Sequence, residues 1–110
     1  MADLKEFADN WLAGAPPGKA INPNPADGAT GIGINADLSW TAGVDATSHD
    51  VYFGTTDPPA FIWNRTAKTF DPGTMTIRTT YYWRIDEVNA WGKTTGTVWS
   101  FTTEWGPPPL

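Results

Sequence analysis

Residues 81–92 read Tyr-Tyr-Trp-Arg-Ile-Asp-Glu-Val-Asn-Ala-Trp-Gly, with large side chains at every second position of the first half. Successive side chains of a β-strand point to opposite faces of the sheet, so this alternation predicts a strand with one buried face. Tyr81, Trp83 and Ile85 are expected on the buried face, and Arg84 and Asp86 on the open face. The Asn and Gly near the end of the stretch tolerate positive φ and predict a chain reversal. This pattern is typical of a β-sandwich.

The composition favours one domain built from short strands. A chain of 110 residues is long enough for one domain of ordinary size. Seven Trp, five Phe and three Tyr predict a core of flat rings, which fit between two sheets. Eleven Gly and ten Pro leave little room for long helices and suit strands joined by turns.

Charge and hydropathy exclude several classes of partner. The net charge is −5 and there is no Lys/Arg-rich run, so a nucleic-acid backbone would meet a field of the wrong sign. Apolar runs are only a few residues long, which argues against a membrane span, and the start of the chain lacks the pattern of a secretion signal. Because the chain has no cysteine, thiolate metal sites and thiol nucleophiles are excluded.

Residues 1–13 are predicted to form a short amphipathic helix. Their apolar side chains recur at offsets of three and four, and Phe7, Trp11 and Leu12 are expected to dock on an end or edge of the sandwich. The segment also resembles the helix that leaves the calcium loop in dockerin-like repeats of large bacterial extracellular proteins. Most of the ligating positions of such a loop are missing from this chain, so we expect no metal site and interpret the helix as a remnant.

Proline-rich segments are expected on both sides of the sandwich. Residues 14–22 are predicted to be a semi-rigid Pro/Gly linker, and residues 105–110 are predicted to be a Pro-rich linker or tail of similar composition. The sandwich itself is expected to span residues 23–104. Two such linkers suggest one module cut from a string of similar modules, with neighbouring domains of the parent protein as its partners.

Between the linkers, short segments bounded by turn residues predict seven strands. Leu38 and Trp40 are expected inside, as are Val51 and Phe53. Besides the strand at residues 81–88, the predicted strands are residues 24–28, 36–40, 49–54, 61–64, 68–70 and 95–103. Together these segments resemble a fibronectin type III domain, an immunoglobulin-like sandwich. Trp40 matches the core tryptophan of its second strand, and Tyr81 matches the tyrosine at its corner.

Several short motifs carry a narrower resemblance. The segments Asn-Pro-Ala-Asp-Gly-Ala-Thr-Gly, Leu-Ser-Trp, Asp-Val-Tyr-Phe-Gly-Thr and Trp-Ser-Phe-Thr-Thr resemble modules of large planctomycete-type bacterial surface or secreted proteins. The resemblance implies a secreted or cell-surface location. Glu87 departs from the pattern, because the family usually has a small apolar residue there. A carboxylate on the inward face needs hydrogen-bond donors, which loop N–H groups or a Trp indole are expected to provide.

No arrangement of residues predicts an enzyme. Asp86 and Glu87 are adjacent on a strand and point to opposite faces, so they cannot flank one bond as a glycosidase pair. Ser48, His49 and Asp50 diverge for the same reason, which excludes a catalytic triad. His49 is the only histidine, so a metal site is not expected. We therefore predict no catalytic residues, no cofactor and no metal.

Exposed tryptophans supply the alternative function. Trp63 is expected on an edge strand, Trp91 in a loop and Trp105 in the tail, where their rings can stack on sugars or on a partner. Covering the sandwich ends is the competing interpretation of the same residues. The sequence thus predicts an all-β, seven-stranded fibronectin type III sandwich with an N-terminal helix. Its predicted function is a non-catalytic spacer or adhesion module. The alternative is a carbohydrate-binding accessory module that tethers an enzyme to polysaccharide.

Overall fold

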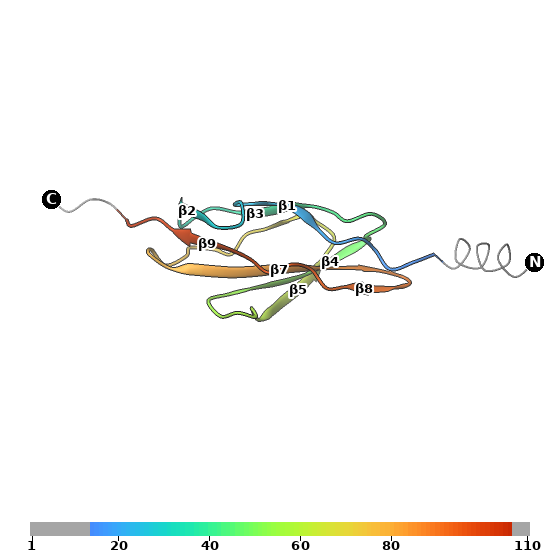
Figure 1. Ribbon diagram of the computed structural model, residues 1–110. Helices are drawn as coiled ribbons and strands as arrows, with labels where there is room; N and C mark the ends of the chain where they lie inside the picture. Colours follow the sequence, from blue (N-terminus) through green and yellow to red (C-terminus); the bar gives the residue numbers. More distant parts are fainter. Residues whose placement is uncertain (1–13, 107–110) are drawn as a thin grey trace, which may run out of the picture.

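Two layers of strands form the molecule, which a computed structural model describes over residues 14–106, and all strand pairs are antiparallel except β2 with β9. The smaller layer has the order β1-β3-β6, and the larger has the order β2-β9-β7-β4-β5, with β8 paired to β7. Figure 1 shows the layers facing each other along their length. The strands are β1 (Ile21–Asn24), β2 (Ala29–Ile32), β3 (Leu38–Thr41), β4 (Ser48–Gly54), β5 (Phe61–Arg65), β6 (Thr69–Phe70), β7 (Thr80–Asn89), β8 (Gly92–Thr94) and β9 (Trp99–Thr103).

The predicted architecture of seven strands with an N-terminal helix is wrong. The described residues form nine strands and no helix, so none of them crosses a membrane as a helix. Residues 1–13, where the helix was predicted, lie outside the described residues. The all-β sandwich itself is confirmed by the two facing sheets.

The two extra strands lie at the beginning and the end of the sandwich. One strand was predicted in each of these regions, and the structure has β1 and β2 in the first and β8 and β9 in the last. After β1, Pro25 has no N–H to donate and Gly28 turns with φ 83°, so the chain leaves the smaller sheet and β2 pairs with β9 in the larger one. The last strand is interrupted between β8 and β9. There the N–H of Gly96 donates to the Asp86 carboxylate (2.9 Å) instead of continuing the ladder.

Aromatic rings fill the space between the layers, as the composition predicted. Trp83 is fully buried at the centre, with its ring centroid 6.2 Å from that of Trp40 and 4.8 Å from that of Trp99. The Tyr81 ring stacks between Phe53 and Phe101, at centroid distances of 5.1 and 5.8 Å. Of the predicted inward positions, Leu38, Trp40, Val51, Tyr81, Trp83 and Ile85 are buried, and Phe53 is partly buried and packs against them. Alternation along each strand therefore identified the core correctly.

The hydroxyl of Tyr81 fixes the corner that leads into β7. It accepts a hydrogen bond from the backbone N–H of Thr76, five residues upstream, at 2.8 Å. Thr103 supports the same corner, since its hydroxyl donates to the carbonyl of Thr76 (2.6 Å) and accepts from the N–H of Thr79 (2.9 Å). This arrangement is the tyrosine corner of immunoglobulin-like sandwiches.

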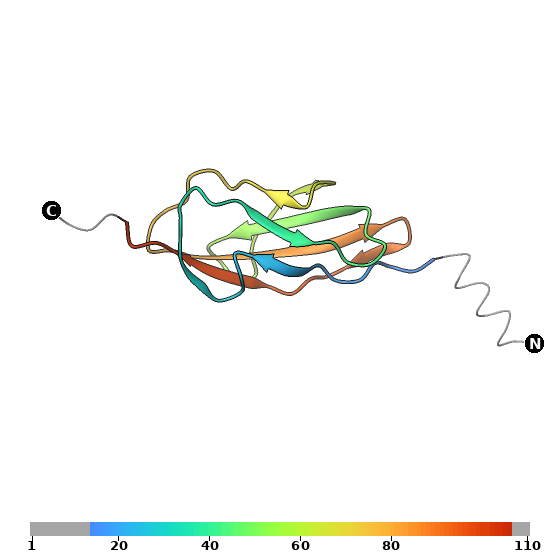
Figure 2. The same cartoon turned by 90° about the horizontal axis from the view of Figure 1, so that it is seen from above.

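The described chain enters and leaves at opposite ends of the sandwich (Figures 1 and 2). At the entry, Pro17 is buried and its carbonyl accepts from the Thr94 hydroxyl (2.6 Å), while the Gly18 N–H donates to the Val44 carbonyl (3.0 Å). At the exit, the Arg78 guanidinium lies over the Trp105 ring, 4.7 Å from its centroid. Both terminal segments are thus held against the sandwich by specific contacts.

Candidate functional site

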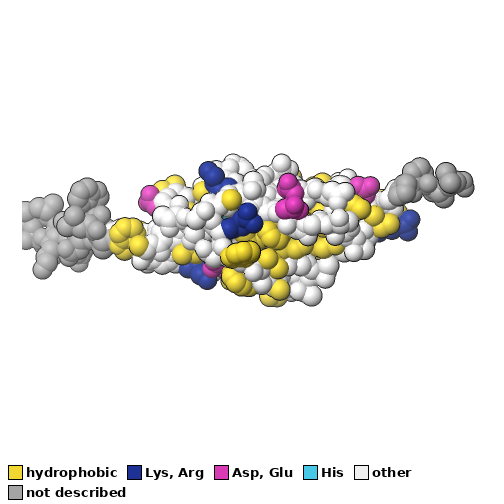
Figure 3. Space-filling view, turned by 180° about the vertical axis from the view of Figure 1, so that it is seen from behind, with side chains coloured by type: hydrophobic (Ala, Val, Ile, Leu, Met, Phe, Trp, Pro, Cys, Tyr) yellow, Lys and Arg dark blue, Asp and Glu magenta, His cyan; other side chains and the backbone are white. Residues whose placement is uncertain are grey.

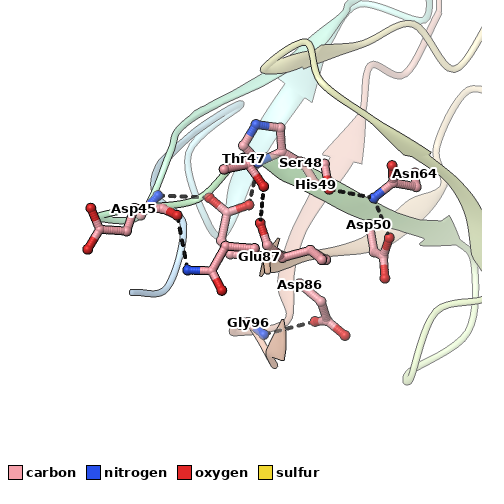
Figure 4. A network of polar contacts seen from close by, with 12 residues as sticks. Asp45, Thr47, Ser48, His49, Asp50, Asn64, Asp86, Glu87 and Gly96 are labelled. Carbon is pink, nitrogen blue, oxygen red and sulfur yellow. Dashed lines mark hydrogen bonds and ion pairs between the residues drawn. The ribbon is translucent and has the colours of Figure 1, made fainter. Parts of the chain in front are cut away.

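A buried polar cluster lies beneath the loop that joins β3 to β4. Glu87 on β7 is completely buried, and its Oε1 accepts a hydrogen bond from Nδ1 of His49, the residue directly opposite on β4. Its other oxygen, Oε2, accepts from the N–H of Gly43 (2.7 Å). Figure 4 shows these contacts converging on one carboxylate. A loop N–H donor was predicted and is present in Gly43, but the second donor is the His49 ring and not a further loop N–H or a Trp indole.

The participation of His49 was not predicted from the sequence. Its ring is 3 % exposed and meets the Trp40 ring edge-on, with centroids 5.5 Å apart. The signal was available, because a lone histidine on an inward strand position needs a polar partner when it is buried. The pair is enclosed by the core, so its geometry fits a structural role for both side chains.

A second polar network covers the outer face of the larger sheet. Asp50 on β4 lies directly opposite Asp86 on β7, and both are nearly buried. Each carboxylate has its own cation: Lys93 contacts Asp50 at 2.7 Å, and Arg84 donates to both oxygens of Asp86 at 2.8 and 3.0 Å. Two facing carboxylates would repel each other without these partners.

The expectation that Asp86 faces solvent is only half right. It points to the opposite face from Glu87, as predicted, but it is only 2 % exposed because Arg84 and the Gly96 N–H enclose it. The segment between β8 and β9, which contains Gly96, therefore covers the Asp86 carboxylate. Sequence alternation gives the face of a side chain, but not what later segments lay over that face.

The charge pairs shift the pKa values of the two cations. Hydrogen bonding to Asp50, followed by the charge of Asp50, raises the pKa of the Lys93 ammonium above its usual range. Burial lowers the pKa of the Arg84 guanidinium, but its hydrogen bond and charge interaction with Asp86 reverse this and leave the pKa raised. Arg84 also lies over the Tyr52 ring, 4.0 Å from the centroid. Both cations stay charged throughout the physiological pH range.

These polar groups do not form a catalytic arrangement. Ser48 and Asp50 both accept from the Asn64 amide, at 3.0 and 2.8 Å, while His49 points into the core. His49 therefore points away from Ser48 and Asp50, as predicted, while those two side chains share one face of β4. Within residues 14–106, no three His, Asp or Glu side chains are placed to share a metal ion.

The exposed apolar surface gathers at β5, the edge strand of the larger sheet. Phe61 is 54 % exposed, Ile62 43 % and Trp63 69 %. Figure 3 shows apolar side chains grouped low on the rear face, where this edge lies. The register places Phe61 opposite Tyr52 and Trp63 opposite Val51, with an irregularity between the two pairs. The edge therefore carries aromatic rings on both of its faces.

A shallow hollow of about 470 Å³ adjoins Trp63 on this edge. Asn64, Arg65 and Thr66 complete its lining. Arg65 belongs to none of the ion pairs within residues 14–106, and its Nε is buried without a hydrogen-bond partner there. An exposed indole beside hydrogen-bonding side chains is the arrangement that a small polar ligand with an apolar face requires.

The other two predicted tryptophans lie at the two ends of the sandwich. Trp91 is 54 % exposed and borders a hollow of about 380 Å³ with Gly14 and Asp45, while Trp105 is 74 % exposed beside Arg78. The structure does not bring Trp63, Trp91 and Trp105 together into one surface. Phe7, Trp11 and Leu12 lie outside the described residues, and their docking stays a prediction.

Asn89 has a role that the sequence did not reveal. It was expected to supply positive φ in the turn, but that conformation falls on Gly92, with φ 151°. Asn89 instead uses its side chain: Nδ2 donates to the carbonyls of Ala15 (2.9 Å) and Asp45 (3.1 Å), and Oδ1 accepts from the Trp91 N–H (2.8 Å). One amide thus joins the entering chain, a loop and the hairpin.

Comparison with known proteins agrees with this fold. The chain matches no protein-family model, and no curated protein is significantly similar to it. Two solved structures resemble it, described as "Crystal Structure of FN3tt" and "Structure of FN3tt mut". The first has a TM-score of 0.59 at 19% identity and covers 80% of this chain and 98% of its own. The second has a TM-score of 0.58 at 15% identity, covering 80% and 96%.

The nine strands, the tyrosine corner and these likenesses define the fold as a fibronectin type III-like sandwich. At such low identity the similarity concerns the fold alone. Any function must therefore be argued from the surface of the molecule.

Proposed function

We propose that the protein is a non-catalytic module that sets distance and orientation between neighbouring domains of a larger extracellular protein. The observation that carries this proposal is the position of the two chain ends. The described chain enters beside Trp91 and leaves beside Arg78, at opposite ends of the sandwich (Figure 1). Domains joined at these ends would be separated by the length of the module.

The contacts at both ends support a rigid connection. Asn89 and Thr94 bind the backbone of residues 15 and 17, and the Arg78 Nε donates to the Trp105 carbonyl at 3.3 Å. In this proposal residues 23–104 form the module and residues 14–22 and 105–110 act as short connectors. A connector held at several points transmits orientation better than a free one.

A pair of fluorescent labels tests the spacer role. Because the chain has no cysteine, Val44→Cys near the entry and Thr30→Cys near the exit give unique attachment points, and both side chains are exposed. Single-molecule energy transfer should show one narrow distance that is unchanged between low and high ionic strength. A broad or salt-dependent distribution would contradict a rigid spacer.

Carbohydrate binding is the second candidate function, and the hollow beside Trp63 favours it. The indole there is more than two-thirds exposed, and polar side chains line the space next to it. Sugars present both an apolar ring face and hydroxyls, so they need these two kinds of contact together. Affinity electrophoresis on a panel of polysaccharides tests this function, with Trp63→Ala as the variant that should abolish retardation.

A further inference from the structure

We infer that the β5 edge recognises an acidic polysaccharide through a uronate sugar, with Trp63 stacking on the ring and Arg65 binding the carboxylate. This inference rests on the second candidate function and assigns it a ligand class. The ligand is identified by the chemistry of two side chains that share a face of the edge strand.

The spacing of the two side chains fits one sugar residue. Trp63 lies opposite Val51 and Arg65 opposite His49, so both belong to the same face of β5. Two residues along a strand are about 7 Å apart. A sugar ring and its attached carboxylate span a similar length, so one residue can contact both side chains at once.

The charge state of the edge distinguishes a uronate from a neutral sugar. Arg84 and Lys93 are each paired with a carboxylate, whereas Arg65 forms no ion pair among the described residues and is the charged side chain that lines the hollow. A guanidinium presents parallel N–H groups that match the two oxygens of a carboxylate. The Nε of Arg65 is itself buried, so the terminal N–H groups of the guanidinium are the ones that would bind the carboxylate.

The overall charge of the chain does not oppose this assignment at physiological ionic strength. The net charge is −5, but charges farther than about 8 Å from the ligand are largely screened in about 0.15 M salt. Asp50, which lies opposite Asn64 on the neighbouring strand, is already bound by Lys93 and by the Asn64 amide. Arg65 is the charged side chain among the residues that line the hollow.

The test compares the migration of the full chain in native gels with and without three polymers: polygalacturonate, a neutral glucan and a sulfated galactan. Polygalacturonate should retard the protein, and the other two should retard it less. Trp63→Ala and Arg65→Gln should each weaken the retardation at least about tenfold, with Arg65→Lys intermediate. Trp105→Ala is the matched control, since it removes an equally exposed indole at a distant position and should change nothing.

The outcomes separate the inference from the function on which it rests. Equal retardation by the neutral glucan, insensitive to Arg65→Gln but lost in Trp63→Ala, would overturn the uronate assignment and leave carbohydrate binding standing. Preference for the sulfated polymer would also overturn the carboxylate assignment. No retardation by any polymer, with the melting temperature of each variant showing a folded protein, would overturn both.

Discussion

His49 and Glu87 lie directly opposite each other on β4 and β7, and the imidazole Nδ1 donates to the carboxylate Oε1 inside the core. The two residues are 38 positions apart in sequence. The same carboxylate receives the Gly43 N–H, so the pair also fixes the loop between β3 and β4. A polar contact in an aromatic core thus determines how one end of the sandwich closes.

Replacing only one member of this pair should destabilise the protein strongly. Glu87→Leu leaves both the His49 ring and the Gly43 N–H without a partner, and such a change costs about 3–5 kcal/mol of unfolding free energy. The double variant His49→Leu/Glu87→Leu should be less destabilised than the sum of the two single variants, because neither side chain of the pair then remains without its partner and only the Gly43 N–H lacks an acceptor. Urea denaturation measures all four proteins, and strict additivity would show that the two side chains do not interact.

Removing the Tyr81 hydroxyl should loosen the corner before β7. Tyr81→Phe keeps the stacked ring but leaves the Thr76 N–H without its acceptor, which should cost about 1–2 kcal/mol. Thermal unfolding measures the loss. Tyr82→Phe is the control, because the Tyr82 hydroxyl makes no side-chain hydrogen bond with the described residues and that variant should unfold like the parent. If the two variants lowered the melting temperature equally, the hydrogen bond between the Thr76 N–H and the Tyr81 hydroxyl would not stabilise the corner.

A methyl group at position 96 should not be accommodated. A Cβ added to Gly96 would lie 2.0 Å from the Ile85 carbonyl oxygen, so β7 and the segment between β8 and β9 would have to separate. Gly96→Ala should therefore lower the unfolding free energy by about 1–3 kcal/mol or more.

Gly33→Ala is the matched control for that substitution. Its added Cβ would meet only the flexible end of the Glu104 side chain, at 3.4 Å, and its φ lies outside the left-handed region. Stability should change by less than about 1 kcal/mol. Equal unfolding free energies of the two alanine variants in urea denaturation would show that the close approach at Gly96 does not affect stability.

The Lys93–Asp50 pair should stabilise the protein below about pH 10.5 and lose its effect above it. The folded state raises the Lys93 pKa, so its contribution is complete below the unfolded pKa of 10.5 and disappears as pH rises through the folded value. The contribution should be less than about 1 kcal/mol, because the Lys93 side chain is half exposed and solvent screens the pair.

The difference in stability between the parent and Lys93→Gln isolates this effect from other titrating groups. It should be constant from about pH 6 to pH 9 and shrink at higher pH. Denaturant unfolding at each pH provides the measurement. A difference that grows with alkalinity would reverse the sign and refute the assignment of the shift to Asp50.

Much of the core could be predicted because strand alternation is a local property. Trp83, Ile85 and Val51 were placed inside from the spacing of large residues, and all three are fully buried. The number of strands could not be predicted in this way. Pairing decides where a strand begins and ends: β2 pairs with β9 from the far end of the sequence, and the segment after β8 leaves the ladder because the Gly96 N–H donates to Asp86.

The exposed edge was predicted in part. Trp63 was assigned to an edge strand from its position, and it lies on β5 at the edge of the larger sheet. Arg65 was not singled out, because its significance depends on its lining the same hollow as Trp63 without an ion pair among the described residues. That information exists only after all the charged side chains have been placed.

By itself, the sequence determined which side chains alternate toward a core of rings and that the fold is an all-β sandwich, because a strand's two faces are set by its own backbone. Tertiary structure alone decided that His49 meets Glu87, that Asp86 is covered, and that Arg65 lies beside an exposed indole without a partner. These relations join residues on different strands, and the register that brings them together results from the packing of the whole sandwich.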